Sequence, residues 1–311
     1  MAAAKAKSVF IDGEAGTTGL QIVDRLAGVT GLSVKSIDPK LRKDAAARLA
    51  MMRDVDAVVL CLPDDAAKEA VALADSLGRE APKIVDASTA HRVVDGWVYG
   101  FAELDAKQAD RIRTAKRVAN PGCYPTGAIA LLRPLIDAGI LPKDFPISVN
   151  AVSGYSGGGK SMIENYEVAK AAPAFELYAL GLEHKHVPEL MAYTGLTHRP
   201  IFVPSVGNFK QGMLVSIPLH LDSLPGKPKL ADLEAVLTKH YAGSDRVRVV
   251  ANAAALSRLE PEALNNSDQL ELYVFGNDKQ RQALLVARLD NLGKGAAGAA
   301  VQNLQLMVGL A

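Results

Sequence analysis

The chain has 311 residues, of which 49% are hydrophobic and 22% are charged, as is typical of a globular protein with one large domain or two. Its formal net charge of +1 gives no global electrostatic reason to bind nucleic acid or a membrane surface. Two cysteines form neither a disulfide framework nor a zinc signature, and no apolar run approaches the roughly 18 residues of a spanning helix. The N-terminus lacks the apolar run of a signal peptide, so we expect a cytoplasmic enzyme-sized protein.

The first predicted element is a short buried strand, Ser8 to Asp12, which runs into a glycine-rich turn from Gly13 to Gly19. An apolar-periodic helix follows from Leu20 to Leu26. A strand, a glycine turn and a helix in this order are the context of a dinucleotide fingerprint, in which backbone N–H groups hold a pyrophosphate. The spacing is G-x-x-G-x-x-G rather than the commoner G-x-G-x-x-G, and the alternative is a tight structural turn.

Strands and helices continue to alternate after this turn. The predicted strands are Leu32–Asp38, Ala57–Leu62 and Lys83–Ala87, and the predicted helices between them are Ala45–Met52 and Ala66–Leu77. Repeated βαβ units of this kind predict an α/β Rossmann domain with a doubly wound parallel sheet. Ligands of such sheets bind beyond the carboxyl ends of the strands.

Two signals conflict at the end of the second predicted strand. Asp38 lies where an acid often binds the ribose hydroxyl of NAD. Lys35, Lys40, Arg42 and Lys43 surround it, as the 2′-phosphate of NADP would require. Because a charge cluster is more often a solvated loop, the sequence leaves this choice open.

Polar residues at the end of the fourth predicted strand, Asp86 to Arg92, are expected to face the same crevice as the cofactor. Ser88 and Arg92 are candidate substrate-binding residues. The guanidinium of Arg92 can pair bidentately with an anionic group of the substrate. The alternative is a surface loop with a helix cap. A helix is predicted next, from Asp105 to Lys116.

Cys123 is the candidate nucleophile. A Pro-Gly turn delivers it to the start of a helix that Tyr124 and Pro125 begin. Unpaired N–H groups and the positive end of the helix dipole stabilise a thiolate there and can hold an oxyanion. The alternative is a buried cysteine that acts as a small apolar residue, which is how we interpret Cys61 within its predicted strand.

Beyond Asp137 the pattern changes to irregular segments and widely spaced strands. The predicted strands are Ile147–Val152, Met213–Leu221, Val247–Val250, Leu270–Phe275 and Ala283–Leu289, and Gly293–Leu310 is predicted to form a helix that returns to the first domain. We therefore expect residues 1–122 and 291–311 to form the dinucleotide-binding domain. Residues 123–290 would form an α+β catalytic and oligomerisation domain, inserted before the C-terminal helix.

Residues Gly154 to Ser161 match the phosphate-loop pattern G-x-x-x-x-G-K-[ST]. No convincing strand ending in a magnesium-binding Asp follows, apart from one that Pro218 interrupts, so a nucleoside triphosphatase is disfavoured. Lys160 and the loop amides can still bind an anion such as a substrate phosphate.

A second function class comes from Ser153, Tyr166 and Lys170, whose spacing is similar to the catalytic set of short-chain dehydrogenases. In such a site, Lys lowers the pKa of the tyrosine so that it can act as acid or base. An alcohol or ketone oxidoreductase is therefore the alternative hypothesis, and an exposed helix surface is the simplest explanation.

His184 and His186 lie close together between acidic residues, but the spacing shows no third metal ligand, and we expect no metal. Either histidine can activate a cysteine nucleophile and transfer a proton.

Six motifs together make the chain resemble the N-acetyl-gamma-glutamyl-phosphate reductase family, specifically its shorter subfamily. They are GEAGTTG (13–19), DASTAHR (86–92), NPGCYPT (120–126), SGYSGGGK (153–160), HKHVPEL (184–190) and DNLGKGAAG (290–298). The family is similar to aspartate-semialdehyde dehydrogenase and joins a Rossmann domain to an α+β domain that carries the cysteine.

The resemblance implies NADPH-dependent reduction of an acyl phosphate to N-acetyl-glutamate semialdehyde, in arginine biosynthesis. It implies Cys123 as the nucleophile that forms a thioester and His186 as the general acid and base, with His184 open as the alternative. The residues implied to bind the cofactor are Gly13, Gly16, Thr17, Thr18, Gly19 and Asn291, and those implied to bind the substrate are Ser88, Arg92, Ser156, Lys160 and His184. The family is usually oligomeric, which leaves a homodimer and a homotetramer open.

Overall fold

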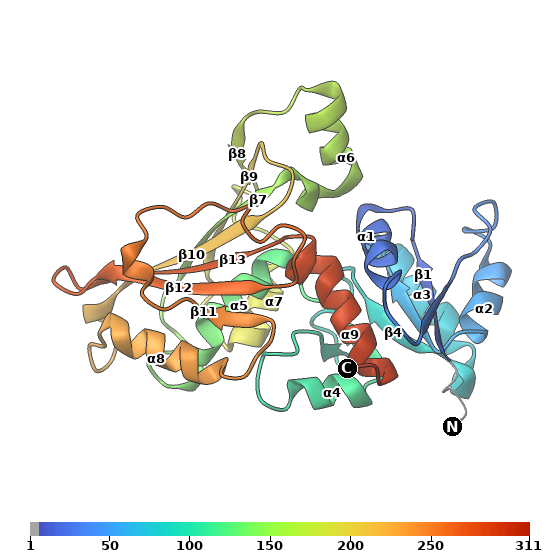
Figure 1. Ribbon diagram of the computed structural model, residues 1–311, viewed down its shortest axis with the longest axis horizontal. Coiled ribbons are helices and arrows are strands. Elements are labelled where there is room, and N and C mark those ends of the chain that lie inside the picture. Colours follow the sequence, from blue (N-terminus) through green and yellow to red (C-terminus); the bar gives the residue numbers. More distant parts are fainter. Residues whose placement is uncertain (1–5) are drawn as a thin grey trace. The chain divides into compact units, whose positions relative to one another are not determined.

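The computed structural model describes residues 6–311, and these residues form two compact units (Figure 1). The first unit runs up to Ala102 and includes Ala106–Pro121 and Ala296–Ala311. The second unit consists of Gly122–Gly295 and the short segment Glu103–Asp105. Each unit contains its own sheet, so the chain folds as α/β followed by a mixed α+β part, as predicted.

The first unit is a parallel sheet with helices on both faces. Over the described residues its strand order is β2-β1-β3-β4-β6-β5, and every paired neighbour is parallel. Its strands are β1 (Lys7–Asp12), β2 (Leu32–Lys35), β3 (Ala57–Leu60), β4 (Lys83–Asp86), β5 (Val98–Tyr99) and β6 (Arg117–Ala119). Its helices are α1 (Thr17–Leu26), α2 (Ala45–Arg53), α3 (Asp64–Asp75), η1 (Gly78–Glu80), α4 (Gln108–Thr114) and α9 (Gly298–Val308). The predicted doubly wound Rossmann sheet is confirmed.

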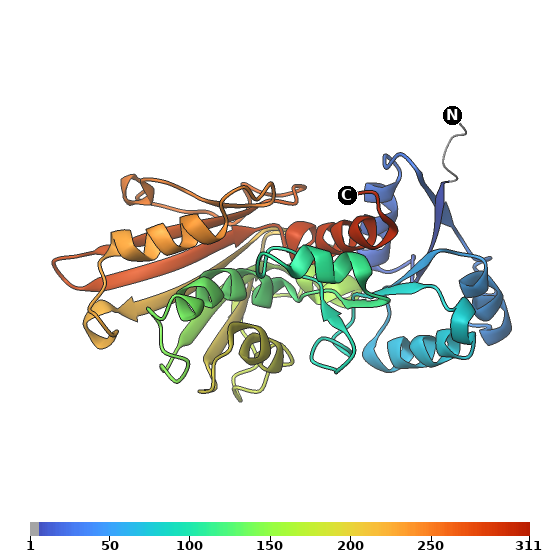
Figure 2. The ribbon, with the colours of Figure 1, turned by 90° about the horizontal axis from the view of Figure 1, so that it is seen from below.

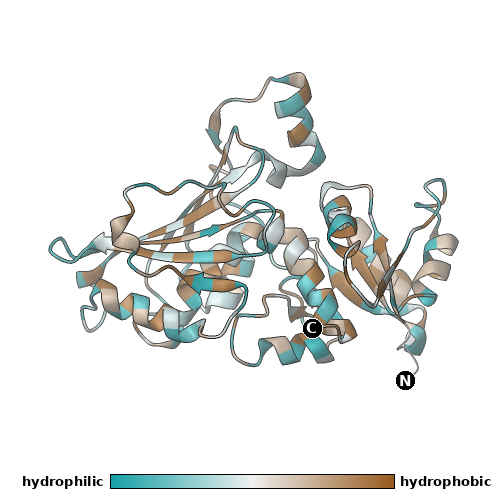
Figure 3. Ribbon diagram, in the orientation of Figure 1, coloured by the Kyte–Doolittle hydropathy of each residue, from teal (hydrophilic) through white to brown (hydrophobic). Residues whose placement is uncertain are grey.

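Alternation along β1 divides the core of this unit between two layers. Val9 and Ile11 pack with α1, α4 and α9, whereas Phe10 packs with α2 and α3 on the opposite face. In Figure 2 the helix α9 lies beside α4, and Figure 3 shows hydrophobic residues concentrated on the strands. Because helices cover both faces of this sheet, its central strands consist of consecutive apolar residues in the sequence.

Several predicted limits in this unit differ from the structure. The strand predicted to reach Asp38 ends at Lys35, and the Asp38 carboxylate instead accepts a hydrogen bond from the Lys40 N–H at 2.9 Å, which forms a turn. The two-residue strand β5 was not predicted, because so short an element has no periodicity. The helix α1 begins at Thr17, within the predicted glycine turn.

The second unit is built on a mixed sheet with the order β11-β12-β13-β10-β7-β9-β8 over the described residues. Its strands are β7 (Ser148–Gly154), β8 (Phe175–Leu177), β9 (Ile201–Gly207), β10 (Met213–His220), β11 (Val247–Val249), β12 (Leu270–Asn277) and β13 (Gln282–Leu289). Its helices are α5 (Cys123–Asp137), η2 (Tyr155–Gly158), α6 (Gly159–Ile163), η3 (Glu164–Ala169), α7 (Val187–Thr194), η4 (Leu221–Ser223), α8 (Leu230–His240) and η5 (Ala253–Ala255). A short helix, η6 (Gly293–Ala297), precedes α9, so the predicted C-terminal helix is in two parts.

Helix α5 packs directly on this sheet, against β10 and β13. A Cβ atom at Gly127 would lie 2.9 Å from Val215 Cγ2 and 3.2 Å from Ala287 Cβ, so only glycine permits this close approach. Helix α8 contacts β11, β12 and helix α5, and its residue Leu237 is fully buried. The strands β8 and β9 and the helix α8 were not predicted from the sequence.

Candidate active site

The glycine turn after β1 requires glycine at two of its predicted positions. Gly13 has a φ of +93°, and a Cβ atom there would lie 2.3 Å from the carbonyl oxygen of Cys61, just beyond β3. A Cβ atom at Gly19 would lie 2.4 Å from the carbonyl oxygen of Gly13. This turn stands between β1 and β3, where the strand order of the sheet reverses and where doubly wound sheets bind their ligands.

The start of α1 offers unpaired donors beside this turn. Gly16 is its N-cap and has no capping side chain, and the first intrahelical bond runs from the Leu20 N–H to the Gly16 carbonyl. The N–H groups of Thr17, Thr18 and Gly19 therefore precede the helical ladder. The close backbone approach at the glycines and the N–H groups at the start of the helix are compatible with a bound pyrophosphate.

The polar side chains that follow β4 make hydrogen bonds within the first unit. They are Ser88, His91 and Arg92. The buried Asp86 carboxylate accepts from the Ser88 hydroxyl at 2.7 Å and lies 2.5 Å from His91 Nδ1. His91 stacks on Trp97 with 4.2 Å between ring centroids. The Arg92 Nε donates to the Asn120 carbonyl at 3.0 Å, so this guanidinium also supports the backbone before Cys123.

Cys123 is the first residue of the 15-residue helix α5, as predicted. Gly122 caps that helix without a side-chain bond, and its own N–H donates to Glu189 Oε1 at 2.8 Å. Glu189 is only 1% exposed. On another side, a Cβ atom at Gly295 would lie 2.9 Å from Cys123 Cβ, so Gly295 leaves the room that the cysteine occupies. The turn that presents the thiol is thus hydrogen-bonded to Glu189 of α7 and closely approached by the C-terminal motif. The spacing of residues in the sequence predicts neither contact.

The structure brings both candidate histidines together in the second unit. The His184 and His186 ring centroids are 4.7 Å apart, and they lie 6.3 Å and 5.9 Å from the ring of Tyr124, the neighbour of Cys123. The His186 N–H donates to His184 Nδ1 at 3.1 Å, so a neutral His184 carries its proton on Nε2. Burial lowers the pKa of His184 to about 4, which keeps this ring neutral at pH 7.

Asn291 and Ser156 also lie together, although the sequence assigned them to the cofactor and to the substrate respectively. Asn291 Nδ2 donates to Ser156 Oγ at 2.9 Å, and Asn291 Oδ1 accepts from the Gly212 N–H at 2.8 Å. The neighbouring Asp290 is fully buried and accepts from Gln211 Nε2 at 2.6 Å. No local signal in the sequence predicts the contact between Asp290 and Gln211, because the two positions are far apart in the chain.

The phosphate-loop pattern does not form a phosphate cradle. The N–H groups of Tyr155 and Ser156 donate to the carbonyls of Phe209 and Lys210, at 3.0 Å each, so the protein itself uses them. The Lys160 side chain is 81% exposed and lies 3.8 Å from Glu164, one turn away. A resident nucleoside triphosphate therefore has no support here, although the exposed ammonium remains available to an anion.

The short-chain dehydrogenase set is not arranged for catalysis. The Ser153 hydroxyl donates to the Gly154 carbonyl, while the ring of Tyr166 stacks on Tyr155 with 4.6 Å between centroids. Lys170 ends η3 in a left-handed conformation. Among residues 6–311 no three His, Cys, Asp or Glu side chains gather as metal ligands, and no helix has the length and apolarity to span a membrane.

Comparison with known proteins finds relatives whose sequences align with this chain over nearly the full length of both. An N-acetyl-gamma-glutamyl-phosphate reductase of Mesorhizobium japonicum is 54% identical over 308 residues, which cover 97% of this chain and 99% of that one. The protein of the same name from Brucella ovis is 56% identical over 97% and 98% of the two chains. This chain belongs to the N-acetyl-gamma-glutamyl-phosphate reductase family. The predicted family and its oxidoreductase class are confirmed, and the short-chain dehydrogenase alternative is not supported.

Two family descriptions and the solved structures agree with this assignment. Residues 30–112 match "Semialdehyde dehydrogenase, NAD binding domain" and residues 123–291 match "Semialdehyde dehydrogenase, dimerisation domain". A solved aspartate semialdehyde dehydrogenase II of Vibrio cholerae, complexed with ASA, has a TM-score of 0.71 at 15% identity and covers 98% of this reductase-family chain and 99% of its own. Another aspartate semialdehyde dehydrogenase, with NADP, from Candida albicans has a TM-score of 0.65 at 14% identity, over 97% and 98% of the chains. The predicted nicotinamide cofactor is therefore supported by a matched binding domain, and the fold by the structures.

Proposed function

We propose that this chain catalyses the NADPH-dependent reduction of N-acetyl-gamma-glutamyl phosphate to N-acetyl-glutamate 5-semialdehyde and phosphate, in cytoplasmic arginine biosynthesis. The observation that carries the proposal is Cys123 at the start of α5, in a chain whose relatives bear the corresponding name. The Cys123 thiolate attacks the acyl carbon, the bond to phosphate breaks, and a thioester remains. The N–H groups in the first turn of α5 stabilise the oxyanion of this step.

When bound, NADPH would supply the hydride that reduces the thioester, and the general acid would protonate the resulting oxyanion to give a thiohemiacetal. The thiohemiacetal loses its hydroxyl proton, the carbon–sulfur bond breaks, and the aldehyde leaves with Cys123 restored. The backbone N–H groups of Thr17, Thr18 and Gly19 would hold the pyrophosphate of the cofactor, and Gly13 and Gly16 would shape the turn around it. Asn291 of the C-terminal motif would also contact the cofactor. Accordingly, we assign dinucleotide binding to residues 1–122 and 291–311, and catalysis to residues 123–290.

The 2′-phosphate of NADPH would be bound in the loop after β2. Lys35 is not available to it, because its ammonium lies 2.5 Å from Asp54 Oδ2. Lys40, Arg42 and Lys43 are exposed, and within residues 6–311 no ion pair holds any of them. These three cations are our candidates for the phosphate-binding residues.

The substrate carries a carboxylate and a phosphate, and five polar residues are proposed to bind them: Ser88, Arg92, Ser156, Lys160 and His184. The exposed ammonium of Lys160 suits the phosphate, which must also depart into solvent. His184 offers a neutral N–H donor at Nε2 to a substrate oxygen.

His186 is our general acid and base, because His184 stays neutral and uses Nδ1 as an acceptor. Replacing His186 by glutamine is expected to lower kcat about 10²- to 10⁴-fold and to flatten its pH dependence. The matched change His184→Gln should raise KM and leave the pH profile between about pH 5 and 8 unmoved, since His184 does not titrate there. A pH profile that His184→Gln flattens would reverse the two roles.

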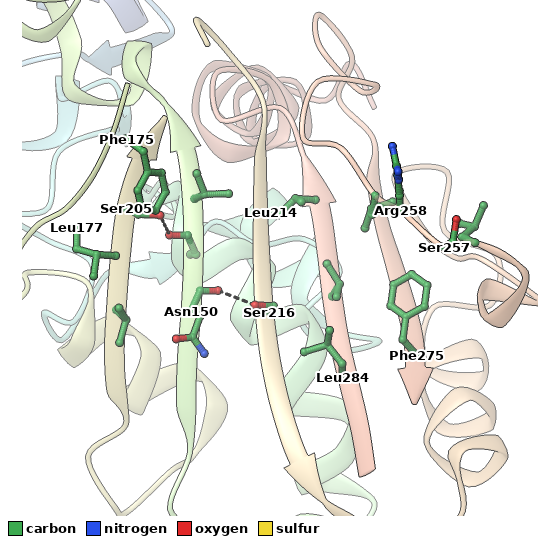
Figure 4. Close-up of a pocket in the computed structure, with 16 residues that line it drawn as sticks. Asn150, Phe175, Leu177, Ser205, Leu214, Ser216, Ser257, Arg258, Phe275 and Leu284 are labelled. Carbon is green, nitrogen blue, oxygen red and sulfur yellow. Dashed lines mark hydrogen bonds between the residues drawn. The ribbon is translucent and has the colours of Figure 1, made fainter. Parts of the chain in front are cut away.

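A groove on the seven-stranded sheet of the second unit supports oligomer formation (Figure 4). It has a volume of about 580 Å³ and lies across β7, β9, β10, β12 and β13, with exposed Phe175, Leu177 and Leu284 at its walls. We propose that a second copy of this chain covers it, because the whole groove falls within residues 123–291, which match a dimerisation domain.

Sedimentation equilibrium tests this interface. The wild-type chain should sediment as a dimer or tetramer of the 32.9 kDa protomer, and Leu284→Arg should dissociate the copies that meet at the groove. The control is Leu180→Arg, which places the same charge at an exposed leucine outside the groove and should leave the mass unchanged. An unaltered mass for Leu284→Arg would remove this face from the interface.

Phosphate-dependent turnover tests the function itself. N-acetyl-glutamate semialdehyde should reduce NADP⁺ only when phosphate or arsenate is present, since either oxyanion must attack the thioester in the reverse reaction. Turnover without either oxyanion would contradict an acyl-phosphate substrate.

A further inference from the structure

A carboxylate stands at the end of β2, although it does not come from that strand. Glu14, the second residue of the glycine turn, accepts a hydrogen bond from the hydroxyl of Ser36 at 2.8 Å. Ser36 is the first residue after β2, and both residues belong to the first unit. In doubly wound dinucleotide domains, the group that reads the 2′ position of the adenosine ribose lies at this end of the second strand.

Two basic side chains of the first unit, Lys35 and Arg48, are already paired with other acids. Lys35 pairs with Asp54 at 2.5 Å. Arg48 donates through Nε and Nη2 to Asp12 Oδ2, at 3.0 Å and 2.6 Å. No ion pair among the described residues neutralises Glu14, so its charge is available to a ligand.

We propose that Glu14, oriented by Ser36, reads the 2′ substituent of the adenosine ribose and makes the chain accept NADH beside NADPH. The inference rests on the dinucleotide site of the proposed function. A carboxylate accepts a hydrogen bond from a 2′-hydroxyl and repels a 2′-phosphate. The exposed cations of residues 40–43 favour the phosphate instead, so the two groups oppose each other and the site discriminates weakly.

Direct binding of two adenine nucleotides to the full chain tests the role of Glu14 without any turnover. Calorimetry with 2′,5′-ADP and 5′-AMP isolates the 2′ substituent. The variant Glu14→Gln keeps the shape of the side chain and its acceptor oxygen for Ser36 but loses the charge. It should bind 2′,5′-ADP about tenfold more tightly and leave the affinity for 5′-AMP equal or a few-fold weaker.

The matched control is Asp38→Asn, which removes the same charge from the same region. The Asp38 carboxylate accepts the Lys40 N–H, so this variant tests whether net charge alone is responsible. An equal gain for Asp38→Asn, or an unchanged ratio of the two affinities for Glu14→Gln, would overturn the role of Glu14. Failure of the wild-type chain to bind either nucleotide would instead overturn the dinucleotide site and, with it, this inference.

A kinetic comparison supplies a second readout. The ratio of kcat/KM for NADPH to that for NADH should rise about tenfold in Glu14→Gln, mainly through KM, because the 2′ position is remote from the hydride. Ser36→Ala, which releases the Glu14 carboxylate, should move the ratio in the same direction by a smaller factor. A change confined to kcat would contradict a role in cofactor selection.

Discussion

Cys123→Ser is expected to lower turnover at least about 10³-fold, because a serine hydroxyl at this position has no base strong enough to make it a comparable nucleophile. Serine differs from cysteine by one atom, and the residue lies exposed enough at the start of α5 to accept it. Binding of the dinucleotide should persist, since the glycine turn belongs to the other unit of the chain. Steady-state kinetics and nucleotide calorimetry measure the two effects separately.

Two control variants make this result specific. Cys61→Ser should retain activity, because burial raises the pKa of the Cys61 thiol to about 12 and leaves it inert. Tyr166→Phe should also retain activity, whereas the loss of the catalytic tyrosine would abolish the activity of a short-chain dehydrogenase. Near-normal turnover of Cys123→Ser would refute the thioester mechanism, and iodoacetamide should inactivate the wild type by labelling Cys123 alone.

Lys294→Met is expected to destabilise the second unit by about 3–5 kcal/mol, the typical cost of removing one partner from a buried ion pair. Lys294 is 1% exposed, and its ammonium lies 2.6 Å from Glu103 Oε2. Burial lowers the pKa of Lys294, and the Glu103 carboxylate counteracts that effect. Urea unfolding followed by circular dichroism measures the loss.

The exposed pair of Lys7 and Asp56 provides the control for this prediction. Its ammonium and carboxylate lie 3.0 Å apart with both side chains more than a third exposed, so Lys7→Met should cost less than about 1 kcal/mol. The double variant Lys294→Met with Glu103→Leu should recover much of the stability, because no buried charge then remains at this pair. Similar losses for Lys294→Met and Lys7→Met would show that the buried pair contributes no more than a surface pair.

Local signals explain most of what could be predicted. The spacing of glycines between a strand and a helix predicted the glycine turn. Gly13 and Gly19 lie too close to backbone atoms of the turn or of the segment after β3 to carry a side chain, so the sequence retains glycine there. The Pro-Gly turn predicted that Cys123 begins a helix, since proline fixes the backbone of a first turn. The short strands β5 and β8 have no such signal, because two or three residues show no period.

Long-range hydrogen bonds account for what the sequence could not predict. Only the structure shows that the carbonyls of Phe209 and Lys210 accept hydrogen bonds from amides of the phosphate-loop pattern. Our proposal of His186 rather than His184 rests on the hydrogen bond that fixes the His184 tautomer and on the burial that lowers its pKa. Neither feature depends on neighbours in the chain alone.

By itself, therefore, the sequence determined the alternating α/β order, the glycine turn and the cysteine at a helix start, because turns, caps and periodicity act over a few residues. The tertiary structure decided which groups support them. Glu189 holds the Gly122 amide, Gly295 makes room for Cys123, and Ser36 orients Glu14, each from a distant part of the chain. Such contacts depend on how the elements pack, and packing brings together residues whose separation in the sequence carries no periodic signal.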